Sequence, residues 1–451
     1  MHPGSCHVPK DDRTRSWVTS TQQHYFPLSP PPDEVAPEPV SSKRKRVMSH
    51  RSDSLKRQRT EPEPVDELLP EQSASQLGSS TPFPLHEKTT FSPPTSRLSS
   101  KRSPSPTRET PIILRSAWPP VVVESLNGLK VAPPTHVERL GDLLADGVDS
   151  RFIPKGLEQV IKSDPDVGYQ VIKPADYDSS DIRSADELTA LWETVKNLFL
   201  NARDCKDGNR DENAWCDDVL QPLIHLAMRI YGNEQWWFQG VQSQSINPAY
   251  LSAIPGPTSN DANRLKLIDR KTDYALSYSH RHPTYSSLYK RLIAANKEEI
   301  SHSLDTFTKR TALFSGFEIK PAYGVHTEAE LQMSIWIAAV LRKKQELAYT
   351  AQVPFEPAAI VEPAFTVVGH EHYVYYAYPK NELVAGRSGV HVLGPDSDRF
   401  EKLGTDSIRG IFRLVRLYGN LLKYGTDKDE NGYWGGFLGV VLEKLASDLP
   451  L

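Results

Sequence analysis

The chain has 451 residues, a formal net charge of −4 and three cysteines, Cys6, Cys205 and Cys216. A chain of this length has room for two or three domains. The cysteines lack the spacing of a metal site or a disulfide framework, which argues against a secreted disulfide-rich protein. Because the sequence has no long apolar run and no signal-peptide core, we expect a soluble intracellular protein without a membrane partner.

The first 119 residues differ in composition from the rest. More than half of the 37 prolines lie in the first 120 residues, among serines and charged side chains, so this segment cannot bury enough apolar surface to offset chain entropy. We predict a disordered tail over 1–119. Two basic clusters in it are typical of a bipartite nuclear localisation signal, read by an import receptor, although a solvated basic arm has the same composition. The clusters consist of Lys43, Arg44, Lys45 and Arg46, and of Lys56, Arg57 and Arg59. We expect nuclear localisation, with the cytoplasm as the alternative.

Two amphipathic helices are predicted before the main strands. Apolar residues at helical spacing indicate one helix over 185–203 and another over 212–231. Glu212 opens the second helix on its apolar face. Carboxylates are favoured in first helical turns by the helix dipole, so Glu212 suits an ordinary cap. Trp215 is interpreted as a core residue.

The acidic residues of the central region lie on predicted strands. A strand over 236–247 comes first, and a second, over 264–278, carries Asp273 near its end. Asp269, four residues earlier, is the weaker alternative on the same side of that strand.

The next strand, 311–320, ends in Glu318 and Lys320. Period-two counting places both on one side with Phe314, opposite Phe317. Two carboxylates beside a lysine form an oxygen-rich site that suits a divalent cation facing a phosphodiester.

The remaining elements supply less chemistry. Residues 281–310 form a basic insertion with a helix near 285–300, which either contacts phosphates or is merely solvated. A helix over 327–348 places Gln332 and Trp336 one turn apart, so that Gln332 either hydrogen-bonds a catalytic loop or sits at the edge of the core.

Strands 364–369 and 372–378 form a predicted hairpin. The histidines at its turn, His370 and His372, lack partners at metal-ligand spacing. Helices over 408–424 and 434–447 complete the predicted core.

Five short motifs in this order resemble the PD-(D/E)XK nuclease superfamily, in particular the nuclease-like domain of many fungal proteins. The resemblance covers roughly residues 120–445, and Thr272 replaces the proline of the superfamily's name. The motifs are Glu212-x-x-Trp215, Lys271-x-Asp273-Tyr274, Glu318-Ile-Lys320, Gln332-x-x-x-Trp336 and Val368-Gly-His-Glu-His-Tyr-Val374.

The resemblance implies a restriction-endonuclease-like α/β fold over 120–447, a three-layer α/β/α core with a mixed sheet of four or five strands. It implies a nuclease that uses Mg²⁺ or Mn²⁺ on nucleic acid, with DNA as the expected substrate. Asp273 and Glu318 would bind the metal, Lys320 would assist the water or the developing charge, and Glu212 and Gln332 would support them. Two alternatives stay open: a nuclease-like module that binds nucleic acid or protein without cleaving, and a scaffold domain in which Glu318 and Lys320 form only a surface ion pair.

Overall fold

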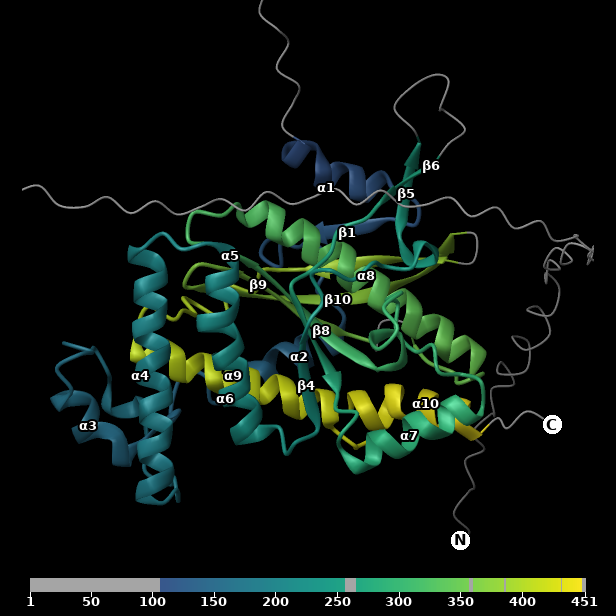
Figure 1. Cartoon of the computed structure of the whole chain (residues 1–451). Coiled ribbons are helices and arrows are strands. Elements are labelled where there is room, and N and C mark those ends of the chain that lie inside the picture. Colours follow the sequence, from purple (N-terminus) through teal and green to yellow (C-terminus); the bar gives the residue numbers. More distant parts are fainter. Residues whose placement is uncertain (1–105, 256–264, 357–359, 385–386, 431, 448–451) are drawn as a thin grey trace, which may run out of the picture. The chain divides into compact units, whose positions relative to one another are not determined.

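The computed structural model describes residues 106–255, 265–356, 360–384, 387–430 and 432–447 (Figure 1). The two basic clusters predicted as a nuclear localisation signal lie outside these residues. The described fold begins before residue 120, with helix α1 (Pro106–Ser116) leading into the first strand. No helix in these ranges is long and apolar enough to span a bilayer.

A mixed sheet of seven strands forms the centre of the described fold, in the order β1-β11-β10-β9-β8-β7-β4. The pairs β1–β11 and β8–β9 are parallel, and the other neighbours are antiparallel. The strands are β1 (Val121–Glu124), β4 (Trp236–Gly240), β7 (Tyr274–Tyr278), β8 (Leu313–Lys320), β9 (Glu362–Val368), β10 (Glu371–Val384) and β11 (Arg387–Leu393).

The structure confirms the predicted mixed sheet. It has seven strands, however, and not the predicted four or five. Strand β1 is a run of four residues, too short to show a period, and β11 includes Gly389, a residue that is unfavourable in strands. β11 pairs with β10 on one side and with β1 on the other, and β1 becomes a strand through that pairing, more than 260 residues apart, with Val121 opposite Val390. The predicted hairpin is confirmed as β9 and β10, and Gly369 adopts the left-handed conformation at its turn, with φ of 56°.

Helices account for most of the remaining described chain. The longer ones are α2 (Thr135–Ala145), α4 (Ala185–Asp207), α6 (Gln221–Tyr231), α7 (Pro283–Ala294), α8 (His326–Thr350), α9 (Ile408–Thr426) and α10 (Gly439–Ser447), and the shorter ones include α3 (Glu158–Ser163) and α5 (Glu212–Ala214).

Helices cover both faces of the sheet. Phe317 of β8 packs against Tyr418 of α9, with ring centroids 5.8 Å apart, whereas a Cβ on the adjacent Gly316 would lie 3.0 Å from Trp336 of α8. Successive strand residues point to opposite faces, so α8 and α9 lie on opposite sides of the sheet, as Figure 1 shows. The predicted three-layer α/β/α core is therefore confirmed.

The predicted helix over 212–231 is interrupted. A π-helical stretch, Trp215–Leu220, separates α5 from α6. Pro222 has no N–H to offer the carbonyl of Asp218 four residues earlier, and the Asn201 side chain from α4 donates to that carbonyl instead, at 3.1 Å. Glu212 therefore belongs to the short α5 and not to the same regular α-helix as Gln221–Tyr231.

The predicted strand over 264–278 is also divided. Its first part, β6 (Leu265–Ile268), pairs with β5 (Ser252–Pro255) outside the central sheet, and β7 begins only at Tyr274. The polar residues 269–272 form the connection. Asp269 and Asp273 therefore do not share a strand side, and Asp273 lies immediately before β7.

A β-bulge changes the faces of β8. The pairing with β7 shifts between Ala275 and Leu276, and Ser315 has a left-handed φ of 59°. As a result Phe314 and Phe317 both contact tyrosines of α9. The prediction that Phe314 and Phe317 lie on opposite sides was wrong, because period-two counting cannot anticipate a bulge.

Candidate active site

The antiparallel pairing of β7 with β8 brings Asp273 beside Glu318. Just before β7, the Asp273 N–H and the Thr272 hydroxyl both donate to the Phe317 carbonyl, at 3.2 and 2.8 Å. The N–H of Ile319 in turn donates to the Asp273 carboxylate, 2.7 Å from Oδ2. Asp273 is thus anchored to β8 on both sides of Glu318.

Lys320 links two carboxylates. Its Nζ lies 2.6 Å from Oε1 of Glu318 and 3.0 Å from Oε2 of Glu212, which begins α5. Glu318 is only 1 % exposed, whereas the Glu212 side chain is 37 % exposed. Glu318 and Lys320 form a buried ion pair. The scaffold alternative supposed that they form an ion pair on the surface.

The electrostatics of these groups are strongly perturbed. Burial, reinforced by the Asp273 carboxylate, raises the pKa of Glu318 to about 9. Burial also raises the pKa of Asp273, although the Ile319 N–H and Gln242 oppose the shift. For Lys320, burial acts to lower the pKa, but the carboxylates of Glu318 and Glu212 outweigh it and raise the pKa. Strongly shifted groups that meet in one place are typical of functional sites.

A pocket of about 460 Å³ opens in front of Asp273. Gln332 of α8 lies in its wall, with Nε2 3.5 Å from the Lys271 carbonyl and with a buried Oε1 that accepts no hydrogen bond within the described chain. Asp269, the weaker alternative for the metal role, also lines this pocket, through the connection between β6 and β7 rather than through a strand. The lining residues are Glu212, Asn213, Gln242, Asp269, Arg270, Lys271, Thr272, Asp273 and Gln332.

Gln242 is a site residue that the sequence did not reveal. It follows the end of β4, and its Nε2 donates to Oδ1 of Asp273 at 2.9 Å and lies 3.9 Å from the sulfur of Cys216. The predicted strand over 236–247 concealed it, because β4 ends at Gly240 and Gln242 belongs to the loop beyond. Only the pairing of β4 with β7 brings it to Asp273.

The donor set fits a hard divalent cation. Oε2 of Glu318 is buried, and no side chain or backbone group in the described residues donates to it. Carboxylate oxygens are the ligands that Mg²⁺ and Mn²⁺ prefer. The described chain contains no cluster of three or more histidine, cysteine or acidic residues that could hold a metal by itself. Asp273 and Glu318 would therefore supply part of a coordination sphere, with water and substrate oxygens completing it.

The aromatic and histidine residues of the motifs make structural contacts. Trp215 is buried and meets the ring of His370 edge-on at 5.2 Å, and Nδ1 of His370 lies 3.1 Å from the Thr405 hydroxyl. Nδ1 of His372 lies 2.7 Å from the hydroxyl of Tyr418 on α9. Trp336 is buried against Gly316 of β8.

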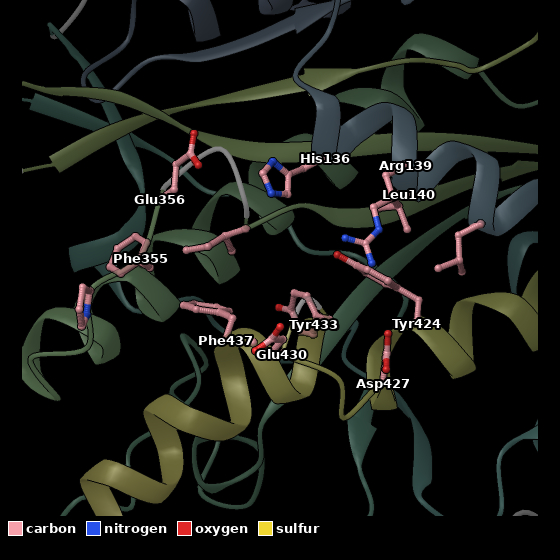
Figure 2. Close-up of a pocket in the computed structure, with 15 residues that line it drawn as sticks. His136, Arg139, Leu140, Phe355, Glu356, Tyr424, Asp427, Glu430, Tyr433 and Phe437 are labelled. Atoms are coloured by element: carbon pink, nitrogen blue, oxygen red, sulfur yellow. The ribbon is translucent and has the colours of Figure 1, made fainter. Parts of the chain in front are cut away.

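A second pocket, of about 280 Å³, shares no residue with the first. Figure 2 shows Arg139 of α2 and Tyr424 of α9 turned toward one another across it. The hydroxyl of Tyr433, which lines it, donates to buried Glu362 and accepts from Lys344 at 2.7 Å, and Lys344 also pairs with Glu362. The other Glu362 oxygen accepts from the Ser315 N–H at the β8 bulge, at 3.3 Å.

The family model of the PD-(D/E)XK nuclease superfamily matches residues 164–434, a range that contains every predicted site residue of the folded part. No curated protein and no solved structure matches the chain.

Proposed function

The chain belongs to the PD-(D/E)XK nuclease superfamily, and from this premise we propose that it is an Mg²⁺- or Mn²⁺-dependent nuclease that hydrolyses phosphodiester bonds of DNA. Membership suggests nuclease activity, and nucleases of this superfamily generally use divalent metals. The observation that carries the proposal is the convergence of Asp273, Glu318 and Lys320 beside one open pocket.

Each residue has a role that its contacts support. Asp273 is fixed by the Ile319 N–H and by Gln242, so its carboxylate is oriented before any ligand arrives. Glu318 offers an oxygen without a donor among the described residues. Lys320 is held between two carboxylates, where its ammonium group can orient the attacking water or neutralise charge that develops on the phosphate.

A divalent cation bound by Asp273 and Glu318 would polarise the phosphate and lower the pKa of a bound water. Glu212, partly exposed, lines the pocket and pairs with Lys320, which ties that ammonium to the pocket wall. Gln332 presents an amide to the Lys271 carbonyl in the pocket wall. In the reaction, a water oxygen bonds to phosphorus while the bond from phosphorus to the departing strand breaks.

A module that binds nucleic acid without cleaving it is the second candidate. It is favoured by the fact that both carboxylate oxygens of Asp273 already accept hydrogen bonds. The described ranges also contain no cluster of three histidine, cysteine or acidic side chains that could hold a metal, which favours the binding module too. In that case the pocket would bind a backbone phosphate without activating a water.

The test is cleavage of supercoiled plasmid and of circular single-stranded DNA by the full chain, with RNA in parallel. Reactions contain Mg²⁺, Mn²⁺ or EDTA, and compare wild type with Lys320→Ala. Removing one group that stabilises transition-state charge is expected to slow cleavage about 100- to 1,000-fold. Lys162→Ala is the matched control, because Lys162 forms only an exposed ion pair with Glu158.

Metal-dependent cleavage that is lost in Lys320→Ala and kept in Lys162→Ala would establish the nuclease. If wild type and Lys320→Ala cleave equally, the catalytic assignment is wrong. If neither cleaves but both retain DNA in a gel shift, the binding module is the better description.

Nuclear localisation is part of the same proposal. The two basic clusters, Lys43–Arg46 and Lys56–Arg59, have the spacing that an acidic import groove reads. Replacing the basic residues of both clusters by alanine in a fluorescent fusion should move the protein to the cytoplasm. Unchanged nuclear accumulation would refute the signal.

A further inference from the structure

A row of planar side chains lies on the surface where β4 and β7 pair. The guanidinium carbon of Arg281 lies 4.5 Å from the ring centre of Trp237. The Trp237 ring meets the ring of His280 at 5.1 Å, and His280 meets Phe307 at 5.1 Å. We call Arg281, Trp237, His280 and Phe307 the aromatic row. Four planar groups from three segments of the chain thus form one continuous surface feature.

The two ends of the row, Arg281 and Phe307, are exposed, whereas Trp237 and His280 between them are half-buried. Phe307 is 47 % exposed, and Leu304 in the same loop is 52 % exposed. Phe307 is fixed all the same, because the Asp305 carboxylate accepts hydrogen bonds from the Phe307 and Thr308 N–H groups, at 3.1 and 2.8 Å. At the other end, the Ser279 hydroxyl accepts from the Arg281 N–H at 3.3 Å. Exposed apolar side chains in a fixed cluster usually mark a binding surface.

The chemistry of the row suits nucleobases. Unpaired bases stack on aromatic rings and on guanidinium planes. Arg281 adds a positive charge for the phosphate backbone, since within the described chain it forms no ion pair with a carboxylate. Burial, and after it the neighbouring Arg281, lower the pKa of His280, which keeps its imidazole uncharged and able to stack at neutral pH.

The row lies along the strand that follows Asp273. Trp237 is opposite Ser277 of β7, and Ser277 lies four residues after Asp273, which immediately precedes β7. At about 3.3 Å per residue, the separation along the strand is roughly 13 Å. A strand of nucleic acid that lies across the pocket can therefore reach the row.

We propose that the aromatic row is a stacking platform for unpaired bases, so that the preferred substrate has a single-stranded segment running from the pocket to β4. The platform has a role in catalysis only if the proposed nuclease function holds, but its binding of bases can be tested by itself. In an intact duplex the bases are stacked on one another, so the affinity of the protein for duplex should not depend on the aromatic row.

The experiment measures binding of the full chain, in EDTA, to a fluorescent 15-residue thymidine oligonucleotide and to a 15-base-pair duplex. The variants are Phe307→Ala and Arg281→Ala. Each should weaken binding of the single strand about 5- to 100-fold and binding of the duplex less than twofold. The controls are Tyr169→Ala, which removes an aromatic ring that is 92 % exposed elsewhere, and Arg203→Ala, which breaks another pair of arginine and aromatic ring with Phe199.

Equal affinity of wild type and both variants for the single strand would overturn the proposal, as would an equal loss for single strand and duplex, or no binding of the single strand by wild type. Plasmid nicking by the same proteins separates this result from the proposed function. Nicking with unchanged single-strand affinity refutes only the platform. Selective loss of single-strand binding without any nicking by wild type supports the platform and refutes the nuclease.

Discussion

Replacing Glu318 by glutamine is expected to stabilise the metal-free protein at neutral pH while removing the proposed nuclease activity. Burial and the Asp273 carboxylate raise the pKa of Glu318 to about 9, whereas the unfolded chain returns it to 4.5. Between these values the folded state keeps a proton that the unfolded state releases. The free energy of unfolding therefore falls as the pH rises through this window.

The size of the effect follows from the width of the window. Each pH unit changes the free energy of unfolding by about 1.4 kcal/mol, so about 3 kcal/mol is lost between pH 4.5 and pH 7. Glutamine has no such proton to release, and its amide oxygen can still accept a hydrogen bond from Lys320. For a domain of this size, about 3 kcal/mol corresponds to a rise in Tm of roughly 5 °C.

The assay is thermal unfolding of wild type and Glu318→Gln in EDTA at pH 5, 7 and 8.5. The advantage of the variant should be small at pH 5 and grow with pH. Adding Mg²⁺ should raise the Tm of wild type more than that of the variant, because the variant keeps only Asp273 of the two carboxylates proposed to bind the ion. Glu193→Gln, an exposed change on α4, is the control. A variant less stable than wild type, or a difference that does not vary with pH, would refute the reasoning.

Two further predictions concern residues around the site. Gln242→Leu removes the amide that donates to Asp273, so Mg²⁺ affinity measured by calorimetry should fall about 10- to 100-fold; unchanged affinity would mean that Asp273 needs no such support. Lys344→Met leaves the Glu362 carboxylate buried without its cation, and the free energy of unfolding in urea should fall by about 3–5 kcal/mol. Adding Glu362→Gln should restore part of that loss, and an additive further loss would contradict this account.

The sequence predicted the fold class and the family because these depend on long periodic segments and ordered motifs. The apolar periodicity of helix α8 and of the hairpin formed by β9 and β10 is strong enough to be recognised from neighbouring residues alone. The sequence also singled out Asp273, Glu318, Lys320 and Glu212, and the structure places them within a chain of hydrogen bonds and ion pairs around one pocket. Their chemical roles remain predictions.

What the sequence missed depends on contacts between distant residues. Strands β1 and β11 are too weak in pattern to be recognised separately; β1 is paired only with the distant β11, and β11 also with β10. The bulge places Ser315, which is not a glycine, in the left-handed region, and its N–H donates to Glu362 of the neighbouring strand. Gln242 reaches Asp273 only after β4 has paired with β7. None of these carries a local signal.

The parallel pairing of β1 with β11 has a consequence for synthesis of the protein. Val121 emerges from the ribosome early, but its partner Val390 follows only after nearly all of the folded part has been made. Until then, the apolar residues of β1 must wait without their neighbour. Contacts this distant in sequence slow folding and leave strand edges open to aggregation. A nascent chain stalled before β11 should therefore depend on chaperones, even though β7 and β8, the strands at the candidate site, have already been synthesised.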